Sequence, residues 1–263
     1  MEGRSPSMNE ILAPVLLSLI AGAASGLGGL VVYLFGEVKD WLMGFLMGFA
    51  GGVMLVVAFL ELFTEALGLL SHMQATLAFI VGAILMMGID LTLPHMEAGR
   101  WERGVAKPEF LKSGLIIAFG ISLHNFPEGL VVSASYSRLP SLGLMMAIMI
   151  CLHNIPEGIA TATPLVLAGV SKRKAAFIAL LSGMTEPLGA LVGSIIIVRL
   201  GASDYIIGMG LALAAGIMTY ITVDELIPMA HEYGSKSPKH IVSTGILAGM
   251  FFGHLVSVLF SIG

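Results

Sequence analysis

HNFPEG at residues 124–129 and HNIPEG at residues 153–158 place the same polar residue types, in the same order, inside two otherwise apolar stretches. In the first motif His124 and Glu128 are four residues apart, so they lie on one face of a helix. The second motif repeats this spacing. The proline before each Glu removes a backbone donor and kinks a helix at that point. Each motif therefore predicts a kinked helix with an imidazole and a carboxylate on one face.

The composition of the chain indicates a membrane protein. Its 263 residues are 57% hydrophobic and 11% charged, with a mean hydropathy of +0.95, whereas soluble domains carry about a quarter charged residues. The formal net charge is -4, and no basic arm suited to nucleic acid is present. Cys151 is the only cysteine, which excludes an internal disulfide and a Cys-x-x-Cys metal site. We expect a single transmembrane domain over residues 1–263, with the lipid bilayer around it and no nucleic-acid partner.

Eight apolar segments are each long enough to cross a bilayer, which takes about 20 helical residues. They cover residues 11–35, 42–69, 75–94, 113–136, 141–168, 174–199, 205–230 and 241–262. An unpaired backbone cannot be exposed to lipid, so each segment is expected to be a helix. The predicted fold class is therefore an all-α membrane protein with eight transmembrane helices.

The charged loops predict the orientation of these helices. If both termini lie on one side, ten of the 13 Lys and Arg residues fall in loops on the opposite side. The positive-inside rule then places those loops in the cytoplasm and both termini outside. The first segment is longer than the core of a signal peptide, so we expect it to be retained. The predicted location is the plasma membrane or a bacterial inner membrane.

Two alignments link the beginning of the chain with its end. Residues 52–66 resemble residues 216–230 with an offset of 164, and residues 19–31 resemble residues 180–192 with an offset of 161. The displacement spans five helices, an odd number, so the second copy crosses the membrane in the opposite direction. Inverted repeats around polar, interrupted helices are typical of transporters. The alternative is chance similarity between Leu- and Gly-rich segments.

Glycines recur at four-residue spacing in several segments. The sets are Gly22/Gly26, Gly44/Gly48 and Gly245/Gly249/Gly253. Small residues at this spacing let two helix backbones approach closely. They indicate either ordinary static packing or a smooth helix face that slides.

The ionisable groups of the two motifs need partners, because each costs about 2.5–3.5 kcal/mol inside a membrane span. The spacing predicts that four of them converge, namely His124, Glu128, His153 and Glu157. Neutral imidazoles and carboxylates suit a divalent transition metal such as zinc, iron, manganese or cadmium. Two shared Glu side chains could support a binuclear centre, with Asn125 and Asn154 able to reach an adjacent site. The alternative is a hydrogen-bond network that only locks the two helices together.

These motifs resemble those of the ZIP (Zrt/Irt-like protein) metal transporters. HNFPEG, HNIPEG and SGMTEPLGA (182–190) are similar to that family's fourth, fifth and sixth helices. DELIPMAHEYG (224–234) resembles the end of its seventh helix, and IDLTLPH (89–95) the end of its third. The resemblance implies a 3+2+3 arrangement, in which the first three and last three helices are inverted repeats around the two motif helices. It also implies an elevator-like movement in a homodimer.

The resemblance further implies the ligands of a binuclear metal site. The first ion would be held by His124, Glu128, His153 and Glu157. The second would be held by Asn125, Asn154 and Glu186, with Glu128 and Glu157 bridging the two ions. The family also draws on its second helix near Glu61 and Glu65, and the sequence leaves open which of these faces the site. Many relatives carry a His-rich loop after the third helix, but this chain offers only His95 there.

The predicted function is import of divalent metal ions into the cytoplasm by alternating access, with zinc first and iron, manganese or cadmium as other substrates. The metal is then a transported substrate, and no cofactor is expected. The alternative is a metal-ion channel or a metal-sensing membrane protein that uses the same site. We do not expect an enzyme, because an intramembrane metalloprotease needs His-Glu-x-x-His and the sequence contains no such string.

Overall fold

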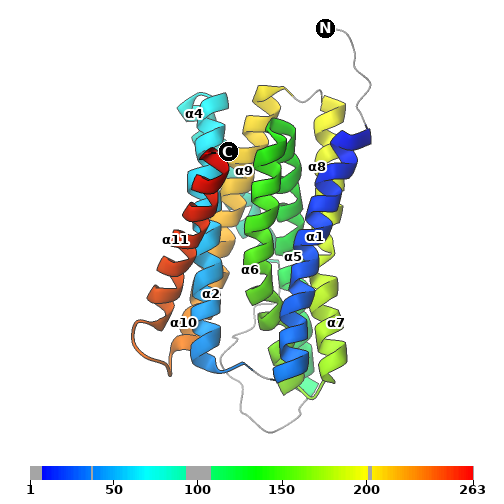
Figure 1. The fold of residues 1–263 in the computed structure, drawn as a ribbon, viewed down its shortest axis with the longest axis vertical. Coiled ribbons are helices and arrows are strands. Elements are labelled where there is room, and N and C mark those ends of the chain that lie inside the picture. Colours follow the sequence, from blue (N-terminus) through cyan, green and yellow to red (C-terminus); the bar gives the residue numbers. More distant parts are fainter. Residues whose placement is uncertain (1–7, 37, 93–107, 201–202, 263) are drawn as a thin grey trace.

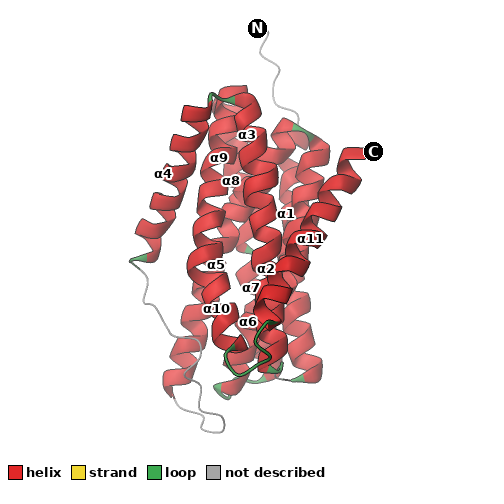
Figure 2. Ribbon diagram, turned by 90° about the vertical axis from the view of Figure 1, so that its left-hand side faces the viewer, coloured by secondary structure: helices red, strands yellow, loops and turns green. Residues whose placement is uncertain are grey.

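The computed structural model describes residues 8–36, 38–92, 108–200 and 203–262, and over these residues it contains helices and short loops but no strand (Figure 2). The helical elements are, in chain order, α1 (Met8–Phe35), α2 (Asp40–Leu55), η1 (Val56–Phe63), α3 (Thr64–Leu69), α4 (His72–Asp90), α5 (Pro108–Arg138), α6 (Pro140–Leu167), α7 (Lys172–Gly183), α8 (Thr185–Leu200), α9 (Asp204–Ile221), η2 (Thr222–Leu226), α10 (Ile227–Gly234) and α11 (Ile241–Ile262). The two η elements are π-helical segments that continue the helices before and after them. The predicted all-α class is confirmed.

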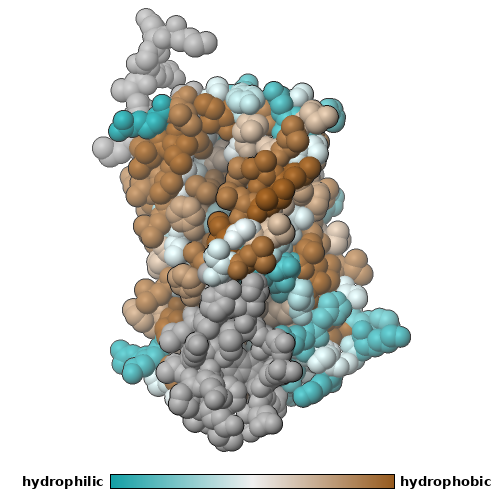
Figure 3. Space-filling model, turned by 180° about the vertical axis from the view of Figure 1, so that it is seen from behind, coloured by the Kyte–Doolittle hydropathy of each residue, from teal (hydrophilic) through white to brown (hydrophobic). Residues whose placement is uncertain are grey.

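Seven helical spans are long and apolar enough to cross a membrane within the part of the chain that the structure describes. They are Asn9–Phe35, Asp40–Leu69, His72–Asp90, Pro140–Leu167, Lys172–Leu200, Asp204–Gly234 and Ile241–Phe260. The helix α5 has 31 residues, enough for an eighth crossing, and contains HNFPEG. On the face drawn in Figure 3, apolar side chains cover much of the surface that is not grey, and polar ones gather toward its two ends. The start of α1 and the end of α11 lie toward the same end of the molecule (Figure 1), which an even number of crossings requires.

The local sequence explains where several helices begin and end. Ser71 Oγ accepts a hydrogen bond from the Gln74 N–H at 3.3 Å, and the Gln74 side chain accepts one from the Ser71 N–H at 3.1 Å. This capping box starts α4. Gly36 and Gly169 follow α1 and α6 with φ of 84° and 86°, a left-handed conformation that favours glycine. Pro140 starts α6, at a position where its missing N–H costs nothing.

The helices form two bundles that lie side by side. The first bundle consists of α1, α5, α6, α7 and α8, on the right in Figure 1; the second consists of the remaining helices and both η segments. In the first bundle α1 packs against α6, α7 and α8, and α5 packs against α6 and α8. In the second bundle α2 packs against α10 and α11, and α4 against α9. The two bundles meet mainly where α6 contacts α2 and where α5 contacts α9.

Glycines make the closest contacts within each bundle. Gly22 of α1 and Gly183 of α7 face each other so closely that a Cβ on either would overlap the carbonyl group of the other. In the second bundle Gly52 of α2 lies against the carbonyl of Ile246 in α11 in the same way. Among the described glycines, every such approach to a neighbouring helix stays inside one bundle. The glycine sets therefore serve static packing, and they do not form a sliding face between the bundles.

The substitution Gly52→Ala should destabilise the protein. Its Cβ would overlap the Ile246 carbonyl, so α2 and α11 would have to separate, and overpacking of this kind costs about 1–3 kcal/mol. Thermal unfolding of the purified protein in detergent measures the effect. Gly88→Ala in α4 is the matched control, because nothing lies within 4 Å of a Cβ there and alanine is the better helix former. Equal melting temperatures for the two variants would contradict the close α2–α11 contact.

Candidate metal centre

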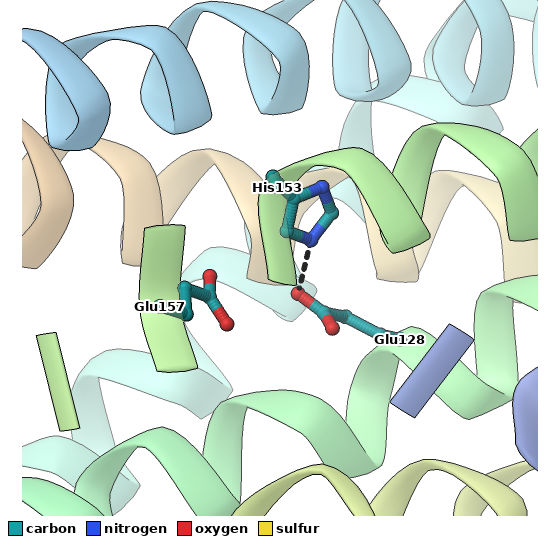
Figure 4. A group of neighbouring side chains, drawn as sticks. All are labelled: Glu128, His153 and Glu157. Carbon is teal, nitrogen blue, oxygen red and sulfur yellow. Dashed lines mark hydrogen bonds and ion pairs between the residues drawn. The ribbon is translucent and has the colours of Figure 1, made fainter. Parts of the chain in front are cut away.

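Three buried metal-ligating side chains meet between α5 and α6 (Figure 4). Glu128 of α5 and His153 and Glu157 of α6 each offer a ligand atom, and these atoms lie within 4.8 Å of one another. His153 Nε2 is 3.0 Å from Glu128 Oε1. Glu128 and His153 are fully buried, and Glu157 is 2% exposed. The second motif therefore contributes both its His and its Glu to this group, and the first motif contributes its Glu.

The glycine that ends each motif packs closely against the backbone of a neighbouring helix. Both motif prolines lie inside continuous helices, so each ligand carboxylate stays on a helix rather than in a loop. Gly129 of α5 lies against the carbonyl of Glu186 in α8, and Gly158 of α6 lies against the carbonyl of Ser25 in α1. A side chain larger than hydrogen would not fit at either glycine. The backbone beside each ligand Glu is thus held in place by the first bundle.

The motif asparagines form a second polar layer beside these ligands. Asn125 Nδ2 donates a hydrogen bond to the Ser182 carbonyl at 3.0 Å, and Asn154 Nδ2 donates one to the Ala21 carbonyl at 3.0 Å. Asn154 Nδ2 also donates to the carboxylate of Glu186. The helix break between α7 and α8 places Glu186 in the first turn of α8. The side chains of Asn125, Asn154 and Glu186 are fully buried.

Several acceptor oxygens in this interior lack a donor. Among the residues that the structure describes, no hydrogen-bond partner is present for Glu128 Oε2, Glu157 Oε2, Glu186 Oε2, Asn125 Oδ1 and Asn154 Oδ1. A buried acceptor without a donor costs about 1–3 kcal/mol, and a buried unpaired carboxylate costs several kcal/mol. A divalent cation would satisfy several of these oxygens at once. Carboxylate oxygens with an imidazole nitrogen are a donor set suited to zinc and its first-row neighbours.

His124 lies apart from the three-residue cluster. Its Nε2 is 2.7 Å from Oε1 of Glu225, which belongs to η2 in the second bundle. The His124 side chain is 4% exposed and that of Glu225 is 25% exposed. Three of the four predicted ligands of the first ion are therefore together, and the fourth faces a carboxylate across the bundle interface. The sequence prediction does not include Glu225, although the internal repeat matches it to Glu61 and so marks it as a candidate.

The carboxylates of the second predicted helix do not join the cluster. Glu65 of α3 pairs with Arg138 at the end of α5, with 2.6 Å between Oε1 and Nε. Glu61 lies half-buried on η1 and is not part of the ligand group found among the described residues. Glu65 is thus paired with Arg138, and which way Glu61 faces stays a prediction. His95, predicted in the loop after the third helix, lies outside the described residues.

We expect Glu128→Gln to weaken equilibrium binding of Zn²⁺ far more than Glu65→Gln. Losing a supporting residue of a metal site costs about 10–100-fold in affinity, so loss of the Glu128 carboxylate should cost about 100-fold or more. Glu65 lies beside Arg138 at a surface that is about one-third exposed, so its neutralisation should change the affinity less than about twofold. Isothermal titration calorimetry of the purified proteins measures both. Similar losses in the two variants would show that the ligand set is wrong.

Comparison with known proteins shows the family of this chain. The family model described as ZIP Zinc transporter matches residues 102–260. The zinc transporter ZupT of Chlorobium phaeovibrioides is 41% identical over 259 residues, which cover 92% of this chain and 96% of the relative. The ZupT proteins of Chlorobaculum parvum and Escherichia fergusonii are each 37% identical, over 96% and 90% of this chain and 99% and 93% of their own lengths. The chain belongs to the ZIP zinc transporter family.

Proposed function

We propose that this protein is a multi-pass membrane carrier that imports divalent transition-metal ions, with zinc as its main substrate. The observation that carries the proposal is the buried group of Glu128, His153 and Glu157. Carboxylate oxygens of Glu128 and Glu157 in this group have no hydrogen-bond donor among the described residues, and a cation would satisfy them. The relatives named as zinc transporters support zinc in particular. Iron, manganese and cadmium are further candidate substrates, because nitrogen and oxygen ligands discriminate weakly among these ions.

The carrier holds two ions in adjacent sites. The first ion binds between Glu128, His153 and Glu157, and His124 joins it when its imidazole leaves Glu225. The second ion binds the oxygens of Asn125, Asn154 and Glu186, with Glu128 and Glu157 bridging. Asn154, which donates a hydrogen bond to the carboxylate of Glu186, directly follows the ligand His153 in the chain, and this supports one continuous site. Shared carboxylates are how paired metal sites hold ions about 3.5–4 Å apart.

Matched contacts in the first bundle support the inverted-repeat arrangement. The offset of 161 residues pairs Ala21 with Ser182 and Gly22 with Gly183. The carbonyls of Ala21 and Ser182 each accept a hydrogen bond from a motif asparagine, one on α6 and the other on α5. Gly22 and Gly183 contact each other, as expected where a two-fold axis passes between equivalent residues. The repeat thus relates α1 to α7–α8 and one motif helix to the other.

Matched contacts in the second bundle support the same arrangement. The offset of 164 residues pairs Gly52 with Gly216. Gly52 lies against a carbonyl of α11, and Gly216 lies against the Phe79 carbonyl of α4. Each partner helix belongs to the other repeat, so the two contacts exchange under the two-fold relation. The π-helical segments η1 and η2 also fall at matched positions, around Glu61 and Glu225. A 3+2+3 order with inverted repeats accounts for all of these pairs.

The two bundles are the moving parts of an alternating-access, elevator-like cycle. Backbone contacts at glycines fix the inside of each bundle, whereas the ion pairs across the interface join side chains, His124 with Glu225 and Glu65 with Arg138. Side-chain pairs can exchange partners when two packed bodies shift, but interlocked backbones cannot. The first bundle carries the ligands, so its movement against the second would expose the ions to each side in turn.

The membrane orientation and the homodimer rest on sequence arguments. The distribution of Lys and Arg predicts that both termini lie outside, and the family resemblance implies a homodimer. Accessibility labelling at the termini tests the orientation. The mass of the detergent-solubilised protein tests the dimer.

Proteoliposomes with the purified protein should accumulate zinc in a saturable manner. His153→Ala should lower the uptake at least about tenfold, since it removes a ligand from the first site. His72→Ala is the matched control, because His72 is exposed at the start of α4. Parallel assays with iron, manganese and cadmium give the substrate range. Uptake that rises linearly with zinc concentration at channel-like rates would favour the channel alternative, and equal uptake by both variants would contradict the site.

Joining the two bundles should stop transport. In a Cys151→Ser background, Glu65→Cys and Arg138→Cys place thiols where the Glu65–Arg138 pair bridges α3 and α5. A short bifunctional thiol reagent should cross-link them and block zinc uptake, because the first bundle can then no longer shift. The two single-cysteine variants, treated alike, should retain uptake. Full transport by the completely cross-linked protein would rule out movement at this interface.

A further inference from the structure

Ser25 occupies in α1 the place that Glu186 occupies in α8. The offset of 161 residues between the repeats pairs these two positions. The carbonyl of Ser25 lies against Gly158 of HNIPEG, and the carbonyl of Glu186 lies against Gly129 of HNFPEG. The two residues therefore have the same backbone relation to the two motifs, although one is a carboxylate and the other a hydroxyl.

The Ser25 side chain is buried with its oxygen unused. Ser25 is fully buried, and Oγ has no hydrogen-bond partner within the described part of the chain. A helical serine often bonds the carbonyl four residues earlier, but here that carbonyl, of Ala21, accepts the amide of Asn154. This face of α1 also borders the metal site, because a Cβ on Gly22 would lie 3.4 Å from Glu186 Oε1.

We propose that the Ser25 hydroxyl is a further oxygen ligand of the second metal ion, on the side away from Glu186. Glu186 contacts Asn154, so the matched position puts Ser25 beside Asn125, whose Oδ1 is likewise buried without a donor. The ion between the two asparagines then has a carboxylate on one side and a hydroxyl on the other. This inference rests on the binuclear site proposed above.

A hydroxyl at this position keeps the affinity for the second ion low enough for the ion to dissociate. Glu128, Glu157 and Glu186 bring three negative charges to the four positive charges of two divalent ions. A fourth carboxylate, in place of Ser25, would neutralise the pair of ions completely. Ligand charge sets the affinity of oxygen sites over several orders of magnitude, and a transport site must bind weakly enough to let its ion leave. Ser25 thus completes the coordination of the ion without trapping it.

Calorimetric titration of the full-length protein with Zn²⁺ tests this role. Ser25→Ala should weaken binding of the second ion about two- to tenfold, the effect of losing one neutral polar contact. Ser25→Asp should tighten it about tenfold or more and slow zinc uptake in proteoliposomes. Ser18→Ala is the matched control, because Ser18 is another fully buried serine of α1 whose Oγ lacks a partner. Equal affinities for the Ser25→Ala and Ser18→Ala proteins would overturn the proposal.

Cadmium absorption provides a direct test of proximity. In a Cys151→Ser background, Ser25→Cys replaces the hydroxyl by a thiolate of similar size, and Cd²⁺ bound in the second site should then show the ultraviolet charge-transfer absorption of a cadmium–thiolate bond. Ser18→Cys should show none. If the parent binds two ions but Ser25→Cys gives no such absorption, the assignment of Ser25 is wrong while the proposed function stands. If the parent binds no metal, the proposed function fails as well.

Discussion

Three carboxylates that are cut off from water, Glu128, Glu157 and Glu186, are the constraint on which the rest of this protein depends. Removing an ionised carboxylate from water costs several kcal/mol unless a partner of opposite charge takes the place of the lost hydration. The surrounding side chains replace only part of the lost hydration, through the contacts of His153 with Glu128 and of Asn154 with Glu186. The remaining acceptor oxygens have no donor among the described residues. The transported ion that we propose would supply the opposite charge and offset the cost of the burial.

The glycines explain how such a polar interior stays in one geometry. At Gly129 and Gly158 the motif helices touch the backbones of α8 and α1 directly, so the backbone next to Glu128 and Glu157 is held against its neighbours. In the second bundle, glycines likewise bring the backbones of α2 and α11, and of α4 and α9, into direct contact. Among the described residues, the ion pairs between the bundles join side chains. This difference in the kind of contact is why we propose that the structure moves at the interface while the ligand geometry is kept.

Much of the fold and the centre of the site can be predicted from the sequence. The four-residue spacing fixes a face within each motif helix, and the duplication implies that the two faces meet. The structure brings Glu128, His153 and Glu157 of these faces together, but not His124. The alignment of residues 19–31 with residues 180–192 anticipates the matched contacts of the two asparagines. Length and hydropathy predict eight spans, and seven candidate spans are found among the described residues.

Other features depend on tertiary packing that spacing cannot reveal. Helical periodicity tells which side chains of α5 share a face, but not that η2 approaches this face and offers Glu225 to His124. In the same way, the glycine spacing shows that helices pack closely without showing which helices they join. The π-helical segments have no composition that separates them from the apolar helices on either side. The Glu65–Arg138 pair links residues 73 positions apart in the chain, and nothing local to either residue points to the other.

The most direct test of the account is anomalous diffraction from crystals of the protein grown with Zn²⁺. Two anomalous peaks should appear about 3.5–4 Å apart, one beside His153 and the other beside Asn125 and Asn154, with Glu128 and Glu157 between them. No anomalous density between α5 and α6 at saturating zinc, with zinc bound only at other places on the protein, would contradict the account.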